Sequence, residues 1–302
     1  MASPQAEALK AAMRAFRDSV VPDGPLPTLE QQRAGAEAGM AAMGVMPDGV
    51  SVTEVEANGV PALWLEPAGA ASDRAVLYLH GGGYVVLSAR SHVRLAAGIA
   101  KSAGCPVLSL DYRLAPEHPH PAAVEDALAG YRWLLGRGLA AGRIAISGDS
   151  AGGGLTMATL LAARDAGLPQ PAAAVPLSPW VDLEGTGESM RTKADTDLIV
   201  GLAGLSSMAD AFVGSGSKRD PLAAPLHADL RGLAPLYIQV GGDETLLDDS
   251  TRLAARAAHA GVDVRLDVFP EMQHVFQTSL GQVPEADDAI ARIGAYLSSR
   301  WA

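Results

Sequence analysis

Short apolar segments alternate with helical segments along most of the chain, and this alternation constrains the fold more than any other feature. The segments expected as strands are 74–80, 105–111, 142–148, 171–178, 234–241 and 263–270. The segments expected as helices lie near 91–103, 121–136, 151–166 and 249–260. Strands that are apolar on both faces and separated by helices are typical of a mostly parallel sheet covered by helices. The sequence therefore predicts an α/β fold.

The chain before this alternation is expected to form two helices, within residues 1–45, and then a hairpin. Apolar residues recur at helical spacing at Leu9, Met13, Phe16 and Val20. The Pro- and Gly-rich segment 22–27 is expected to end the first helix, and Thr28 with Gln31 predicts a capping box for the second. Alternating apolar and polar residues around an Asn-Gly pair predict a hairpin over 50–66.

Residues 185–232 interrupt the alternation and are interpreted as an insertion. One helical face within it is expected to carry Leu198, Leu202, Leu205, Ala209 and Phe212. Open α/β sheets bind ligands beyond the carboxyl ends of their strands, and a lid there would combine this insertion with the N-terminal helices. We therefore expect a single domain over 1–302, with cap elements at about 1–45 and 185–232.

The segment GDSAG, at 148–152, places one serine between a predicted strand and a predicted helix. It matches G-x-S-x-G, in which a tight strand-to-helix turn exposes a nucleophilic hydroxyl. A side chain at Gly148 or Gly152 would collide with the neighbouring strand or helix, and glycine tolerates the strained backbone of such a turn. Ser150 is thus a candidate nucleophile. The alternative is an ordinary Gly-rich turn, because the pentapeptide also arises by accident.

HGGG, at 80–83, follows the first apolar strand directly. Attack on an ester carbonyl places negative charge on oxygen, and fixed N–H donors stabilise that charge. The amides of Gly82 and Gly83, with that of Ala151 at a helix N-terminus, are candidate donors. A phosphate-binding loop is the alternative, but neither G-x-G-x-x-G nor a Lys-Ser/Thr pair follows.

An acidic segment at 241–249 and the loop histidine His274 each follow a predicted strand. Serine, acid and histidine in this chain order are typical of catalytic triads on α/β folds. His274 is therefore a candidate general base, whereas a lone loop histidine is otherwise a surface residue. Asp243 and Glu244 are both candidate acids at this point. The other histidines considered are interpreted as structural or surface residues: His92, His118, His120, His227 and His259.

Four separated motifs together resemble one known family. HGGGYV, DYRLAPEHPHPAAVEDALAGYRWL, GDSAGGG and MQHVF are similar to the hormone-sensitive-lipase-like bacterial esterases, in the GDSAG branch, over about residues 60–295. The resemblance implies an α/β-hydrolase fold with a helical cap, no cofactor, and hydrolysis of short-acyl carboxylic esters. It also implies that Gly82, Gly83 and Ala151 form the oxyanion hole.

The resemblance also bears on the choice of acid. The family pattern, acid-x-Leu-x-Asp-acid about thirty residues before the histidine, matches Glu244 without a gap and Asp243 only with an insertion. Aspartate is nevertheless the commoner acid in the family. We favour Glu244, and we expect Asp248 and Asp249 to lie on a solvated face or cap of the next helix.

The loop 111–121 combines acidic, basic and aromatic residues. A metal site there would use Asp111, Glu117, His118 and His120. Its prolines keep the loop extended, so we favour an Asp111–Arg113 network that braces the oxyanion loop, and we expect no metal.

Six residues are candidates to line a compact apolar pocket for short acyl chains: Tyr84, Trp180, Val181, Leu205, Met208 and Phe212. They come from the HGGG loop, a strand end and the inserted helix. The alternative is that the inserted helix simply packs the cap onto the core, and one residue can serve both roles.

Composition excludes several other classes of protein. The net charge of −11 and pI near 5.0 argue against binding nucleic acid, and no apolar run is long enough to span a membrane. Cys105 is the only cysteine, so no intrachain disulfide and no cysteine metal site is expected. The N-terminus lacks the features of a secretory signal, so a cytoplasmic location is expected. The apolar segment 291–301 could pack on its own sheet or in a homodimer.

These observations predict a serine carboxylesterase without a cofactor. In this mechanism Ser150, deprotonated by His274, attacks a small ester and forms an acyl-enzyme, which water then hydrolyses. Lactone hydrolysis, metabolite deacetylation and amide hydrolysis would use the same residues. A different class, the non-catalytic small-molecule receptors on this fold, would keep the pocket without the triad.

Overall fold

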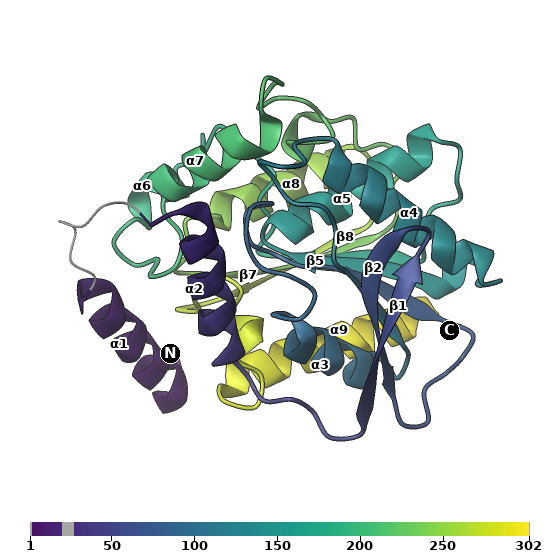
Figure 1. Ribbon diagram of the computed structural model, residues 1–302, viewed down its shortest axis with the longest axis horizontal. Coiled ribbons are helices and arrows are strands. Elements are labelled where there is room, and N and C mark those ends of the chain that lie inside the picture. Colours follow the sequence, from purple (N-terminus) through teal and green to yellow (C-terminus); the bar gives the residue numbers. More distant parts are fainter. Residues whose placement is uncertain (1, 20–26, 302) are drawn as a thin grey trace.

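The computed structural model describes residues 2–19 and 27–301, and eight strands in these residues form one sheet (Figure 1). The strands are β1 (Val50–Ala57), β2 (Val60–Pro67), β3 (Ala75–Leu79), β4 (Val107–Leu110), β5 (Ile144–Asp149), β6 (Ala173–Leu177), β7 (Leu236–Gly241) and β8 (Val264–Phe269). Their order is β1-β2-β4-β3-β5-β6-β7-β8, antiparallel from β1 to β4 and parallel from β4 to β8. The predicted α/β fold and its six strands are confirmed.

Helices cover both faces of the sheet, with α3 and α9 on one side and α4, α5 and α8 on the other (Figure 1). The helices are α1 (Pro4–Ser19), α2 (Leu29–Ala41), α3 (Val93–Ala103), α4 (Ala122–Gly136), α5 (Ala151–Asp165), α6 (Ser189–Thr192), α7 (Leu202–Val213), α8 (Leu247–His259) and α9 (Pro284–Arg300). Strands β3 to β7 are buried throughout, since each packs against helices on two sides.

The N-terminal expectations agree with the structure where it describes them. Thr28 and Gln31 form the predicted capping box, each side chain bonding the other's backbone amide, at 3.3 and 2.9 Å. Val20 and most of the segment 22–27 lie outside the described residues. The hairpin of β1 and β2 turns at the Asn-Gly pair, where both residues have positive φ, as a tight two-residue turn requires.

The inserted helix differs from its prediction at one end. α7 begins at Leu202, so Leu198 precedes it and does not share its face. Leu205, Ala209 and Phe212 are buried, whereas Leu202 is 49% exposed. A hydrophobic face therefore exists, but it spans fewer turns than the sequence periodicity indicated.

Helix α2 is hydrogen-bonded to the loops that follow β3 and β4. The guanidinium of Arg33 donates to the carbonyl oxygens of Val85, at 2.9 Å, and Ala115, at 3.0 Å. It also forms an ion pair with Glu117 at 2.7 Å. This one side chain thus connects α2 to the loop that carries HGGG. Across the described residues, no helix is long and apolar enough to cross a membrane.

Candidate active site

Ser150 occupies a strained turn between β5 and α5. Its φ of 54° and ψ of −120° lie where L-residues are rarely found. A Cβ on Gly148 would lie 2.5 Å from the carbonyl oxygen of Leu79, and one on Gly152 would overlap that same oxygen. The two glycines therefore let the turn close against β3, as their pattern predicted. The surrounding structure maintains the strain and keeps the serine at the carboxyl edge of the sheet.

His274 and Glu244 are in direct contact at the same edge. Nδ1 of His274 lies 2.6 Å from Oε2 of Glu244, whose side chain is fully buried. Oε1 of Glu244 accepts hydrogen bonds from Ser178 Oγ, at 2.8 Å, and from the amide of Gly241, at 2.5 Å. The carboxylate has partners on both oxygens, so it is held in one orientation towards the imidazole.

Asp243, the other candidate acid, points away from this contact. Its carboxylate faces Lys193 at 3.8 Å and Lys10 at 3.9 Å. Adjacent residues at the end of β7 thus take opposite directions, and the structure places Glu244 alone of the two against His274.

Hydrogen bonds at the end of β6 join the turn of Ser150 to the loop of His274. The amide of Ser150 donates to the carbonyl of Leu177 at 2.8 Å. The next residue, Ser178, accepts a hydrogen bond on Oγ from the amide of Val275 at 3.2 Å. Ser178 also has positive φ, which turns its side chain towards Glu244. The serine, histidine and acid predicted from chain order are therefore brought to one rim of the sheet.

The carboxylate determines the protonation of His274. Burial disfavours the charged imidazolium, but Glu244 outweighs burial and raises the pKa of His274 above its ordinary value. An imidazole held in this way binds a proton readily and remains oriented through Nδ1, which leaves Nε2 as its reactive nitrogen.

The HGGG loop presents unpaired amides near Ser150. Gly82 and Gly83 have φ of 109° and 61°, which only glycine adopts without strain. Among the described residues, the amides of Gly82, Gly83 and Ala151 donate no hydrogen bond. The loop is anchored beneath by Asp149, whose Oδ1 accepts from the amide of Gly81 at 3.1 Å. These amides are free to bind an anionic oxygen.

A buried polar network supports this loop. The carboxylate of Asp149 also accepts from Tyr78, at 2.5 Å, and contacts Nε2 of His92 at 3.3 Å. Burial opposes charge on both partners, yet their mutual attraction raises the pKa of His92 and lowers that of Asp149. The role of Asp149 could not be inferred from the sequence, because its partners come from strands and loops distant in the chain.

The six residues predicted to line an acyl pocket lie together but are mostly buried. The rings of Tyr84 and Phe212 stack, with centroids 3.7 Å apart, and Trp180 lies 6.1 Å from Tyr84. Val181 and Leu205 are buried too, and only Met208 is partly exposed. The side chain of Met208 covers the Cα of Gly83. This arrangement packs α7 onto the HGGG loop, while lining a pocket stays a prediction for these residues.

A small pocket opens beside His274. Its lining includes Leu9 and Met13 of α1, and Met272 and Phe276 of the histidine loop. Most of the surface is apolar, which fits the uncharged part of an ester.

Two interpretations of polar residues were wrong. Asp249 is fully buried, and its Oδ2 accepts the amides of Val181 and Asp182, each at 2.9 Å. Burial raises the pKa of Asp249 to about 7. It is not on a solvated face. Asp111 and Arg113 do not pair with each other. Arg113 binds the carboxylate of a residue in α4, Asp126. Asp111 accepts the amide of Ala89 in the loop after HGGG, so the contact with that loop was expected correctly and only the pairing with Arg113 was wrong.

A mostly parallel eight-stranded sheet, with a strained serine and a buried His–acid contact at its carboxyl edge, is the arrangement of a hydrolase. The model of a family described as "alpha/beta hydrolase fold" matches residues 76–278. The acetyl-hydrolase of Streptomyces hygroscopicus is 44% identical over 262 residues, 87% of this chain and 86% of that protein.

Solved esterase structures are similar to this one over all or nearly all of the chain. An esterase from the bacterial hormone-sensitive lipase family is 47% identical with a TM-score of 0.94, and all of both chains is covered. EstE5 in a crystal soaked by p-nitrophenyl butyrate is 42% identical with a TM-score of 0.93, covering 99% of each chain. The chain belongs to the α/β-hydrolase family, among the bacterial hormone-sensitive-lipase-like esterases. It is a carboxylic ester hydrolase.

Proposed function

We propose that the protein hydrolyses short-acyl esters through an acyl-enzyme on Ser150, with His274 as general base and Glu244 as its orienting acid. The observation that carries this assignment is the 2.6 Å contact between His274 and Glu244 at the carboxyl edge of the sheet, where the turn of Ser150 also lies. Nδ1 is occupied by the carboxylate, so Nε2 takes the serine proton and later gives it to the leaving alcohol. Water activated by the same nitrogen then releases the acid.

The oxyanion of the tetrahedral intermediate is assigned to the amides of Gly82, Gly83 and Ala151. Support comes from their lack of acceptors among the described residues and from the position of Ala151 at the N-terminus of α5. A developing negative charge there gains both hydrogen bonds and the favourable end of the helix dipole.

The preference for short acyl chains rests on the size of the site and on two relatives. The pocket beside His274 is small, and Tyr84, Phe212 and Met208 fill the space between α7 and the HGGG loop. One relative is named an acetyl-hydrolase, and another was soaked with a butyrate ester. Within this proposal, residues 1–45 and 185–232 form the cap. A cytoplasmic location and a homodimer stay predictions.

Turnover of a p-nitrophenyl ester series tests the proposal. Acetate or butyrate should be the best substrate, and Ser150→Ala should lower kcat by at least about 10³-fold. A rate optimum at decanoate or longer would contradict the short-acyl preference. Turnover of Ser150→Ala within about tenfold of the parent would contradict the mechanism itself.

A further inference from the structure

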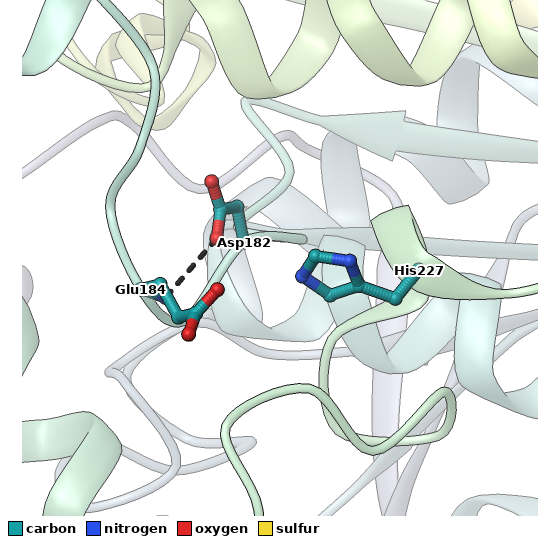
Figure 2. Close-up of side chains that lie close together, drawn as sticks. All are labelled: Asp182, Glu184 and His227. Atoms are coloured by element: carbon teal, nitrogen blue, oxygen red, sulfur yellow. Dashed lines mark hydrogen bonds between the residues drawn. The ribbon is translucent and has the colours of Figure 1, made fainter.

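Asp182, Glu184 and His227 lie close together (Figure 2). They stand at the base of the inserted segment, and none of them belongs to the proposed active site. One ligand atom from each lies within 4.8 Å of the others. Asp182 and Glu184 follow β6, whereas His227 belongs to the short 3-10 helix Pro225–His227 that precedes β7. The three residues therefore come from the two stems of the insertion, which is why no motif revealed them.

The imidazole of His227 has a nitrogen without a partner. Its Nε2 is buried and forms no hydrogen bond within the described residues. Figure 2 shows the ring extending towards the two acidic residues, with one ring nitrogen on the edge that faces them. A buried ring nitrogen without a partner has lost its hydration without compensation, and a metal ion would restore that interaction.

The two oxygens of Asp182 have different surroundings. Oδ2 accepts from Thr186 twice, at 3.0 Å from its amide and 2.5 Å from its hydroxyl, and from Arg252 at 2.9 Å. Oδ1 accepts only from the amide of Glu184, at 3.1 Å, among the described residues. The saturated oxygen holds the carboxylate in place, as hydrogen bonds behind a metal ligand do, and Oδ1 keeps a lone pair for a ligand.

Glu184 supplies the adaptable ligand. Its side chain is 34% exposed, and its carboxylate lies 3.4 Å from Arg219, which is 64% exposed. An exposed ion pair of this kind contributes little, so a cation can replace the arginine. Two ligands at about 2.1 Å from one ion lie at most about 4.2 Å apart, and rotation of the partly exposed Glu184 side chain can bring the three ligand atoms, which lie within 4.8 Å of one another, to that spacing.

We propose that Asp182, Glu184 and His227 bind one transition-series divalent cation, such as Zn²⁺, that joins the two stems of the inserted segment. One imidazole and two carboxylates suit such an ion, whereas Ca²⁺ and Mg²⁺ prefer oxygen ligands throughout. The stems already meet here, because the amide of Leu226 donates to the carbonyl of Val181 at 3.1 Å. The ion acts on the stability of the insertion and takes no part in ester hydrolysis.

Zinc binding by the full chain after removal of metal with EDTA tests this inference. In equilibrium dialysis against micromolar Zn²⁺, the parent should bind one zinc ion per chain, and His227→Gln should bind none at this site. Glu184→Gln should lower the affinity for zinc at least about tenfold, because loss of even an outer-sphere partner of a metal ligand has an effect of this size. His259→Gln is the matched control, because His259 is an exposed histidine on α8.

Thermal unfolding separates site loss from misfolding. Without metal, His227→Gln should unfold at the Tm of the parent, and Zn²⁺ should raise Tm by about 2 °C or more only in the parent and His259→Gln. Zinc that bound elsewhere, for example at His274, would appear equally in all variants. Equal binding by the parent and His227→Gln, or no binding by the parent, would overturn the proposal.

Discussion

Ser178 Oγ lies 2.8 Å from Glu244 Oε1 and donates a hydrogen bond to the carboxylate that contacts His274. The same hydroxyl accepts the amide of Val275, the residue after the histidine. One side chain at the end of β6 therefore positions both the acid and the histidine loop. Its importance was not evident from the sequence, since a serine after a strand has no distinctive pattern.

Ser178→Ala should lower kcat by about tenfold and leave KM nearly unchanged, because Glu244 loses a fixed donor while the substrate pocket is untouched. Ser109→Ala is the matched control: Ser109 is buried in β4, and its Oγ has no hydrogen-bond partner within the described residues. Steady-state kinetics of both variants make the comparison. Equal kcat values would show that Ser178 has no positioning role.

Glu244→Gln and Asp243→Asn distinguish the two adjacent acids. Loss of the charge beside His274 should lower kcat by about 10³–10⁴-fold, as loss of the acid does in other triads. Asp243→Asn removes a charge that faces only Lys10 and Lys193 among the described residues, and kcat should stay within about threefold. If Asp243→Asn were the more damaging change, the assignment of the acid would be wrong.

The pH dependence follows from the raised pKa of His274. The base must be neutral, so kcat/KM should rise with pH through a pKa above 6.5, the ordinary histidine value. Stability changes in the opposite sense. The contribution of the imidazolium–Glu244 pair is complete below the unfolded pKa and is lost as pH rises through the folded pKa.

The Glu244→Gln variant also isolates this electrostatic effect. The residual activity of Glu244→Gln should show its acidic limb at lower pH than the parent, because the attraction that raised the pKa of His274 is gone. An acidic limb at the same pH in both proteins would mean that another group controls it.

Gly152→Ala should destabilise the fold by about 3 kcal/mol and reduce ester hydrolysis, because the added Cβ overlaps the carbonyl of Leu79 and forces β3 away from α5. Gly35→Ala is the control within α2, where nothing lies within 4 Å of the new methyl group. That change should stabilise the protein by about 0.5–1 kcal/mol. Chemical denaturation measures both differences.

The sheet could be predicted from the sequence because burial on two faces leaves a continuous apolar run for each strand. β3 and β5, for example, are buried at every position. The turn of Ser150 was predictable because its signal is local. Glycine is required at two positions within five residues, since a Cβ at either would clash with the neighbouring backbone.

Contacts between distant segments could not be predicted in the same way. Asp249 looked like a helix cap, yet it binds amides beyond β6. Arg113 looked like a partner for its neighbour Asp111, yet it binds Asp126. The cluster of Asp182 and His227 depends on how the two stems of the insertion meet. In each case the partner is chosen by tertiary packing, which leaves no periodic signal along the chain.

Labelling with a fluorophosphonate probe tests the central claim most directly, because the probe reacts only with a serine activated by a nearby base. Intact-mass measurement of the parent should show one adduct, peptide mapping should place it on Ser150, and Ser150→Ala should remain unlabelled. Equal labelling of Ser150→Ala, or an adduct on another residue of the parent, would contradict the account.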